Sequence, residues 1–74
     1  MTPLLAVVLF YTSSHAIRAE QLLQRENIEC KLIPVPRHLS SDCGVCAQIN
    51  RADREAVRRL LAESRVEIQE IHEI

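Results

Sequence analysis

Apolar and polar residues along the chain follow two patterns, one typical of strands and one typical of helices. Residues 4–10 form an unbroken apolar run, which predicts a short strand buried on both faces. Residues 28–33 and 45–49 alternate between apolar and polar positions, which predicts two further strands. A last strand or tail is predicted from three later apolar residues, Val66, Ile68 and Ile71.

Helical periodicity fills the gaps between these strands. Apolar residues three and four positions apart predict helices over 15–26 and 52–64. Residues 12–14 are Thr-Ser-Ser and suit an N-cap for the first helix, and Asn50 suits one for the second. The order β-α-β-β-α-β favours a single α+β domain over 1–74. Its expected form is a ferredoxin-like two-layer sandwich, a four-stranded antiparallel sheet with both helices on one face.

A loop between the second and third strands is the most distinctive segment. Pro34 and Pro36 lack an N–H donor, so helix and central strand are excluded there and residues 34–43 are predicted to form a loop. In a ferredoxin-like sheet the third strand lies between the first two. The end of strand one, the start of the first helix and this loop then share one edge. The residues expected at this edge are Ser14, His15, Arg37, His38, Ser41, Asp42 and Cys43.

Cys43 and Cys46 form a CxxC pair at the end of this loop. A thiol near a helix N-terminus or an arginine such as Arg37 is stabilised as the nucleophilic thiolate. Gly44 is the only glycine, and it would permit a positive φ or close approach of a partner. The pair fits a redox dithiol or half of a zinc site.

Zinc would need two further ligands. The candidates Cys30, His15 and His38 match no familiar zinc spacing. Cys30 falls on the apolar face of strand two, which predicts a small core residue. No metal and no cofactor is therefore expected.

Charge and apolar length limit the classes of partner. The 74 residues have a net charge of −1, which gives no overall basic field for nucleic acid. The apolar run at 4–10 is far shorter than a membrane span, and no basic residue precedes it as in a signal peptide. A cytoplasmic location with reduced thiols is expected. Since strand one is apolar on both faces and the helices cover one, a homodimer or a protein partner is expected on the other.

Two stretches resemble the motifs of a known family. The segment Phe10–Glu20 has a strand end, a Ser/Thr-rich cap and Ala-x-x-x-Glu. The segment Leu32–Gly44 contains Ile-Pro-x-Pro-Arg, then Ser, then Cys-Gly. Together they resemble the selenium/sulfur carrier-like domain family of small bacterial and archaeal proteins, and the resemblance covers nearly the whole chain.

The resemblance implies a carrier rather than a catalyst. Cys43 would hold sulfur or selenium as a persulfide or selenopersulfide, with Arg37, Ser41 and Gly44 as neighbours, between a donor and an acceptor protein. Cys46 departs from the family's pattern and could resolve the persulfide into a disulfide. Two alternatives stay open at this point. One is a protein-binding or regulatory module with incidental cysteines, and the other is a zinc-binding domain.

Overall fold

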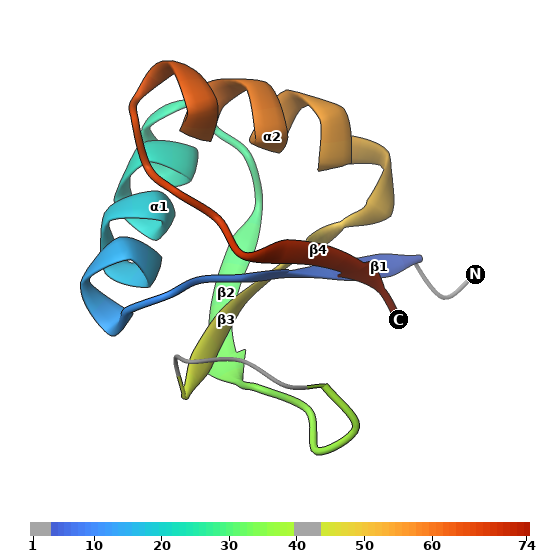
Figure 1. Ribbon diagram of the computed structural model, residues 1–74. Coiled ribbons are helices and arrows are strands. Elements are labelled where there is room, and N and C mark those ends of the chain that lie inside the picture. Colours follow the sequence, from blue (N-terminus) through green and yellow to red (C-terminus); the bar gives the residue numbers. More distant parts are fainter. Residues whose placement is uncertain (1–3, 40–43) are drawn as a thin grey trace.

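A sheet forms one layer of the molecule and two helices form the other (Figure 1). The computed structural model describes residues 4–39 and 44–74, so the predicted site residues Ser41 and Cys43 lie outside the described residues. In chain order the elements are β1 (Leu5–Leu9), α1 (Ser13–Arg25), β2 (Cys30–Pro34), β3 (Val45–Asn50), the short 3₁₀ helix η1 (Arg51–Asp53), α2 (Arg54–Glu63) and β4 (Glu70–Glu73).

The sheet has the order β2-β3-β1-β4, and every neighbouring pair is antiparallel. This confirms the ferredoxin-like arrangement and the place of β3 between β1 and β2. Leu9 of β1 lies opposite Cys46 of β3, which itself lies opposite Ile33 of β2. The end of β1 and the loop between β2 and β3 are therefore at the same end of the sheet, as the sequence predicts.

The main core lies between the sheet and the helices. Side chains alternate across a strand, so every second residue of β1 faces the helices. Ala6, Val8 and Phe10 are fully buried there. The helices and the third strand supply the other large buried side chains of this cluster, Leu23, Ile49, Val57 and Leu61. Ile28, Cys30 and Leu32 pack against the cluster, which confirms the predicted inner face of strand two.

A second, smaller cluster lies on the opposite face of the sheet. Val7, Leu9 and Cys46 are fully buried there. Partly buried side chains from the end of β2 and from the following loop pack against them, namely Ile33, Val35 and Leu39. Figure 1 shows this loop on the side of the sheet away from the helices. The chain itself therefore covers the second face of strand one, where the sequence led us to expect a second copy or a partner.

One of the two N-caps predicted from the sequence is present. The Thr12 hydroxyl accepts a hydrogen bond of 3.2 Å from the backbone N–H of His15, which confirms the predicted N-cap of α1. The prediction that Asn50 caps the second helix is wrong. Asn50 precedes η1 without a capping bond, and its side-chain amide instead donates to Glu29 at 3.4 Å. The Asn50 amide thus links β3 to the start of β2.

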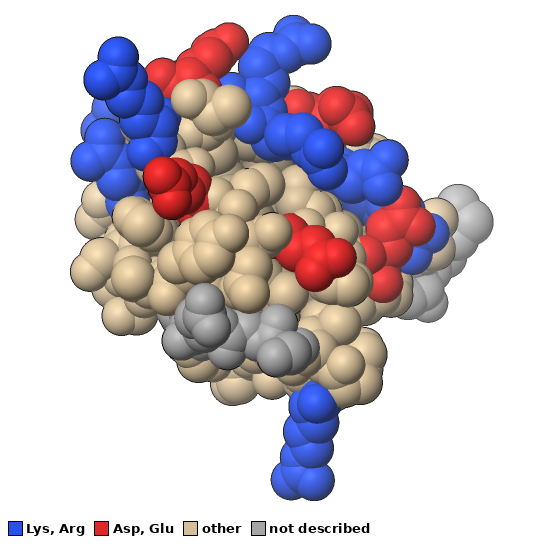
Figure 2. Space-filling view, in the orientation of Figure 1, with Lys and Arg blue, Asp and Glu red and all other residues tan. Residues whose placement is uncertain are grey.

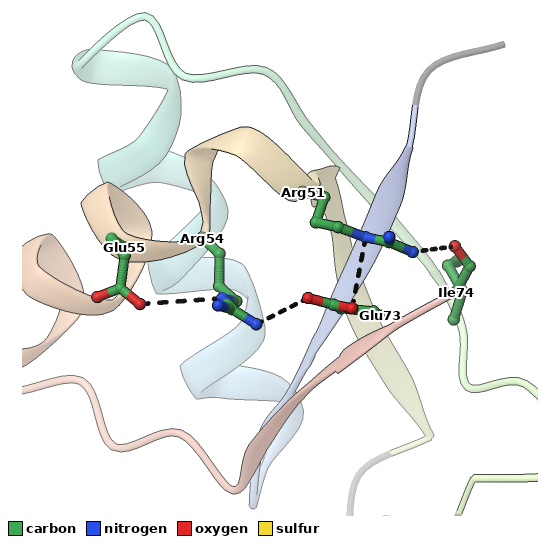
Figure 3. Close-up of polar contacts among 5 residues, drawn as sticks. All are labelled: Arg51, Arg54, Glu55, Glu73 and Ile74. Atoms are coloured by element: carbon green, nitrogen blue, oxygen red, sulfur yellow. Dashed lines mark hydrogen bonds and ion pairs between the residues drawn. The ribbon is translucent and has the colours of Figure 1, made fainter.

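Polar contacts tie the start of the second helix to β4 (Figure 3). Arg54 donates to the Glu73 carboxylate at 2.8 Å, and Arg51 lies 3.7 Å from the same carboxylate. Arg51 also donates to the backbone carbonyl of Ile74 at 3.1 Å. These side chains are half-exposed, so each pair contributes little alone. Their common partner nevertheless fixes β4 against η1 and α2.

Within residues 4–39 and 44–74, neither α1 nor α2 is long and apolar enough to cross a bilayer.

Candidate functional site

The β2–β3 loop is held at both ends by backbone hydrogen bonds. Val35 N–H donates to the Gly44 carbonyl at 3.2 Å, directly beyond the paired residues Pro34 and Val45. Leu39 N–H donates to the Pro36 carbonyl at 3.0 Å and closes a turn. Because Pro34 ends an edge strand, its missing N–H removes no interior ladder bond. Backbone hydrogen bonds thus fix the described parts of the loop, residues 35–39 and Gly44.

Cys46 lies beneath this loop. Its side chain is fully buried beside Leu9 and Val7, and its Sγ lies 4.0 Å from the Pro34 carbonyl oxygen. Burial is expected for the alternation of β3, since Val45, Ala47 and Ile49 face the helices and Cys46 faces the other way. The second thiol of the CxxC motif is therefore enclosed by the chain and has no free path to a large partner.

Gly44 does not have the conformation that the sequence suggested. Its φ is not positive. A Cβ atom built on Gly44 would meet nothing within 4 Å. Neither backbone strain nor crowding within the chain therefore requires glycine here.

The start of α1 lies at the same end of the sheet as this loop but on its other face. Ser14 is exposed, and His15 is partly buried. The Nδ1 atom of His15 is itself buried and has no hydrogen-bond partner among residues 4–39 and 44–74. Because α1 packs on the helix side and Val35 and Leu39 pack on the opposite side, the sheet separates the two groups. The structure brings them to one edge, as predicted, but does not join them in one pocket.

Arg37 and His38 form the exposed turn of the loop. No ion pair within the described residues involves Arg37. Figure 2 shows a basic side chain projecting from the lower end of the molecule, where Figure 1 places this loop. The predicted stabilisation of a Cys43 thiolate by Arg37 concerns a partner outside the described residues.

Cys30 is separated from the other thiols. It packs on the helix side of β2, and its Sγ lies 3.9 Å from the Glu20 carbonyl oxygen. Burial, and to a smaller extent the nearby Glu20 carboxylate, raise the pKa of the Cys30 thiol above its ordinary value of 9.0. The thiol therefore stays protonated at neutral pH. This confirms the prediction that Cys30 is a core residue.

The geometry also bears on the zinc alternative. Cys30 and Cys46 lie on opposite faces of the sheet, so they cannot ligate one metal ion. Across residues 4–39 and 44–74, no three metal-ligating side chains gather in a suitable group. The wider zinc site that the sequence left open, with Cys30 beside the CxxC motif, is therefore excluded.

The sequence reasoning missed two residues of the loop, Val35 and Leu39. They anchor the loop to the sheet through the second apolar cluster. The sequence does contain a signal for this anchoring. Val35 and Leu39 are apolar residues in a loop that otherwise consists of proline, polar and charged residues. Such side chains in a loop beside a two-sided apolar strand indicate a flap folded onto that strand.

Comparison with known proteins identifies the family of the chain. A family model described as putative Se/S carrier protein-like matches residues 5–73. Neither a curated protein nor a solved structure matches the chain. The matched residues run from the first residue of β1 to the last of β4, so they include every strand and helix described above. The chain therefore belongs to the putative Se/S carrier protein-like family.

Proposed function

We propose that this protein carries sulfur or selenium as a persulfide or selenopersulfide on Cys43, between a donor protein and an acceptor protein. The observation that supports this most is the family match over the whole fold. The sequence adds a cysteine beside the only glycine, in the loop that the structure anchors at both ends. The reducing conditions of the cytoplasm would keep this thiol available for loading.

Loading is a thiol exchange at the outer sulfur of the donor. The Cys43 thiolate attacks the terminal sulfur of a donor persulfide, R–S–SH. A new S–S bond forms on Cys43 while the donor's S–S bond breaks, and the donor leaves as the thiolate R–S⁻. The products are Cys43–S–SH and the donor thiolate, so no external oxidant is required. Selenium follows the same course when selenium is the terminal atom.

Delivery reverses this step with a different partner. An acceptor nucleophile attacks the terminal sulfur of Cys43–S–SH, takes that sulfur and releases the Cys43 thiolate. The free carrier is regenerated. Since both steps are transfers between thiols, the protein needs an accessible cysteine and room for two partners, and it needs no catalytic acid or base of its own.

The described residues that precede and follow Cys43 in the sequence support this role physically. Val35 and Leu39 pack against the sheet, so the described part of the loop has a fixed place. The flanking residues Arg37, His38 and Gly44 are exposed. An exposed guanidinium attracts the anionic persulfide of a donor or a carboxylate on its surface. Open space at Gly44 permits a second backbone to come close.

Cys46 gives the loaded carrier a second possible fate. Its thiolate would attack the inner sulfur of Cys43–S–SH, form a Cys43–Cys46 disulfide and release HS⁻. The burial of Cys46 limits the encounter, because its sulfur is enclosed by the loop. We therefore propose that resolution is the slow fate and that handover to an acceptor is the fast one.

Intact mass after incubation with a persulfide donor tests the proposal. We expect one added sulfur on the wild-type chain and none on Cys43→Ser. The Cys46→Ser variant should hold the adduct longer, since the route to the disulfide is lost. Cys30→Ser is the matched control and should load like the wild type. Equal loading of Cys43→Ser and the wild type would refute the assignment of the carrier thiol.

A further inference from the structure

An open groove of about 810 Å³ lies between α2 and the segment that leads into β4. One wall contains Arg58, Leu61 and Ala62 of α2 and Arg65, which follows the end of that helix. The other wall includes Ile68 and Ile71. The groove therefore combines an apolar lining, in which Ala62 is the small residue, with two guanidinium groups.

The groove runs beside a free strand edge. β4 is the last strand of the sheet and pairs with β1 alone. The Ile74 N–H donates to the Leu5 carbonyl at 3.0 Å, so this N–H faces β1. Backbone groups of an antiparallel strand alternate in direction. The N–H and C=O groups of Ile71 and Glu73 therefore point away from the sheet, and a further strand could pair with them.

Charges along the groove favour an acidic occupant. Arg58 and Arg65 have no ion pair or hydrogen bond from their side chains within the described residues. Glu70 also borders the groove, but it lies opposite Leu9 on the other face of the sheet and contacts His72 at 2.8 Å. Glu67 is then the acid that remains on the groove side, beside two guanidinium groups without a partner among the described residues. Figure 2 shows basic side chains, with acidic ones among them, along the upper rim, where Figure 1 places α2.

We propose that this groove binds an extended segment of a partner polypeptide, which adds to the edge of β4 as a fifth strand. Arg58 lies on α2, whereas Arg65 follows the end of that helix and has a φ of 60°. Alternate residues of a strand project from the same face. A segment with an apolar residue between two acidic residues, each two positions away from it, therefore presents all three side chains to the groove, within reach of the flexible arginine side chains.

The middle residue of such a segment lies over Ala62, Ile68 and Ile71, while its two acids meet the guanidinium groups. Main-chain hydrogen bonds to Ile71 and Glu73 supply affinity, and the alternate side chains supply selectivity. This surface is distinct from the β2–β3 loop and uses no cysteine. The inference is therefore independent of the role proposed for Cys43.

A synthetic peptide containing Glu-Thr-Val-Thr-Glu, with blocked ends, is the probe. In amide NMR spectra, we expect millimolar peptide to shift the signals of Ile71 and Glu73 and to slow their hydrogen exchange. The amide of His72 already faces β1 and should change less. Slower exchange at these alternating positions identifies strand addition, because loose adhesion to the surface would not protect them.

Two variants test the groove itself. Arg58→Gln should weaken the peptide about tenfold, which corresponds to about 1.4 kcal/mol. Arg18→Gln removes an equivalent exposed arginine from α1 and is its matched control, with no expected effect on binding. Ala62→Leu places a larger side chain in the groove lining at an exposed helical position, so the fold is retained while binding falls.

Three results would overturn the inference. The first is no change at the Ile71 and Glu73 amides with millimolar peptide. The second is tighter binding of the same peptide with lysine in place of both glutamates, which would assign the groove to a basic segment. The third is equal binding by the wild type and Ala62→Leu, since the groove would then not be the site.

Discussion

The two faces of the sheet are built in different ways. On one face, two helices bury a continuous core that includes the large side chains Phe10, Leu23 and Leu61. On the other, the chain's own β2–β3 loop covers three buried residues through partial contacts. The first face carries most of the apolar burial that stabilises the domain. The second anchors Val35 and Leu39 of the β2–β3 loop, so stability and the chemistry proposed for this loop should respond to substitutions on different faces.

The largest effect is expected from the helix face. Leu23→Ala removes a fully buried side chain of α1 and should cost about 2–5 kcal/mol. A domain of this size has only about 3–5 kcal/mol from its single core. We therefore expect the variant to be largely unfolded in urea titrations followed by circular dichroism. A fully folded variant with an unchanged midpoint would show that the two faces do not divide the stability in this way.

A smaller effect on stability but a larger one on reactivity is expected from the loop face. Leu39→Ala trims a partly buried contact with the second cluster and should cost about 1–2 kcal/mol, as two or so buried methylene groups would. If the substitution lowers the free energy of local loop opening by about 1.4 kcal/mol, the open population rises about tenfold. Alkylation of Cys46 should then accelerate about tenfold. Peptide mapping after iodoacetamide treatment measures that rate.

The matched control for Leu39→Ala is Leu22→Ala. Leu22 is also partly buried, but it packs on the helix face. The same atoms are removed, so global stability should fall by a similar amount while Cys46 under native conditions stays protected. Equal acceleration in both variants would mean that Cys46 is exposed by global unfolding, and the separate role of the loop cover would be lost.

Gly44→Ala separates the needs of the fold from those of transfer. The residue has no positive φ and open space around it, so the free energy of unfolding should change little or rise by about 0.4–1 kcal/mol. Loading from a small-molecule persulfide should be unchanged. Loading from a protein donor should slow, because the added methyl group obstructs only a large partner. Equal rates with both donors would remove the proposed reason for glycine.

The smallest effect concerns Cys30 and pH. Its native pKa is raised above 9.0 by burial and by Glu20, so the unfolded chain loses this proton first as pH rises. The stabilising contribution is complete below the unfolded-state pKa and is lost as pH rises through the native value. Urea midpoints of the wild type should therefore decline above about pH 9.0 more steeply than those of Cys30→Ala. Parallel declines in the two proteins would contradict this.

The fold could be predicted because its signals are local. Alternation in residues 45–49 fixed which side of β3 faces the helices, and the two-sided apolar run at 4–10 identified the central strand β1. Thr12 was recognisable as a cap because its hydroxyl acts within one helical turn. Asn50 was not, because its side chain bonds to Glu29, which is 21 residues away in the sequence.

The site was predictable only in part. Topology alone brings Ser14, His15 and the loop to one end of the sheet, but it does not say on which face the loop folds. That choice depends on Val35 and Leu39, whose contacts with Val7 and Leu9 are distant in sequence. A partner was inferred for an apolar face that the chain covers itself. The periodicity of apolar residues shows that a strand face is buried. It does not show which segment buries that face.

The most direct test of the account is a two-step transfer with isotopically labelled sulfur. The chain is loaded from a labelled persulfide donor, separated from that donor and mixed with a low-molecular-weight thiol. We predict that the label is found on Cys43 by peptide mapping and then leaves as the persulfide of the added thiol, with the chain returning to its unmodified mass. Label that never loads, or that maps to Cys30 or Cys46 with Cys43 unmodified, would contradict the account.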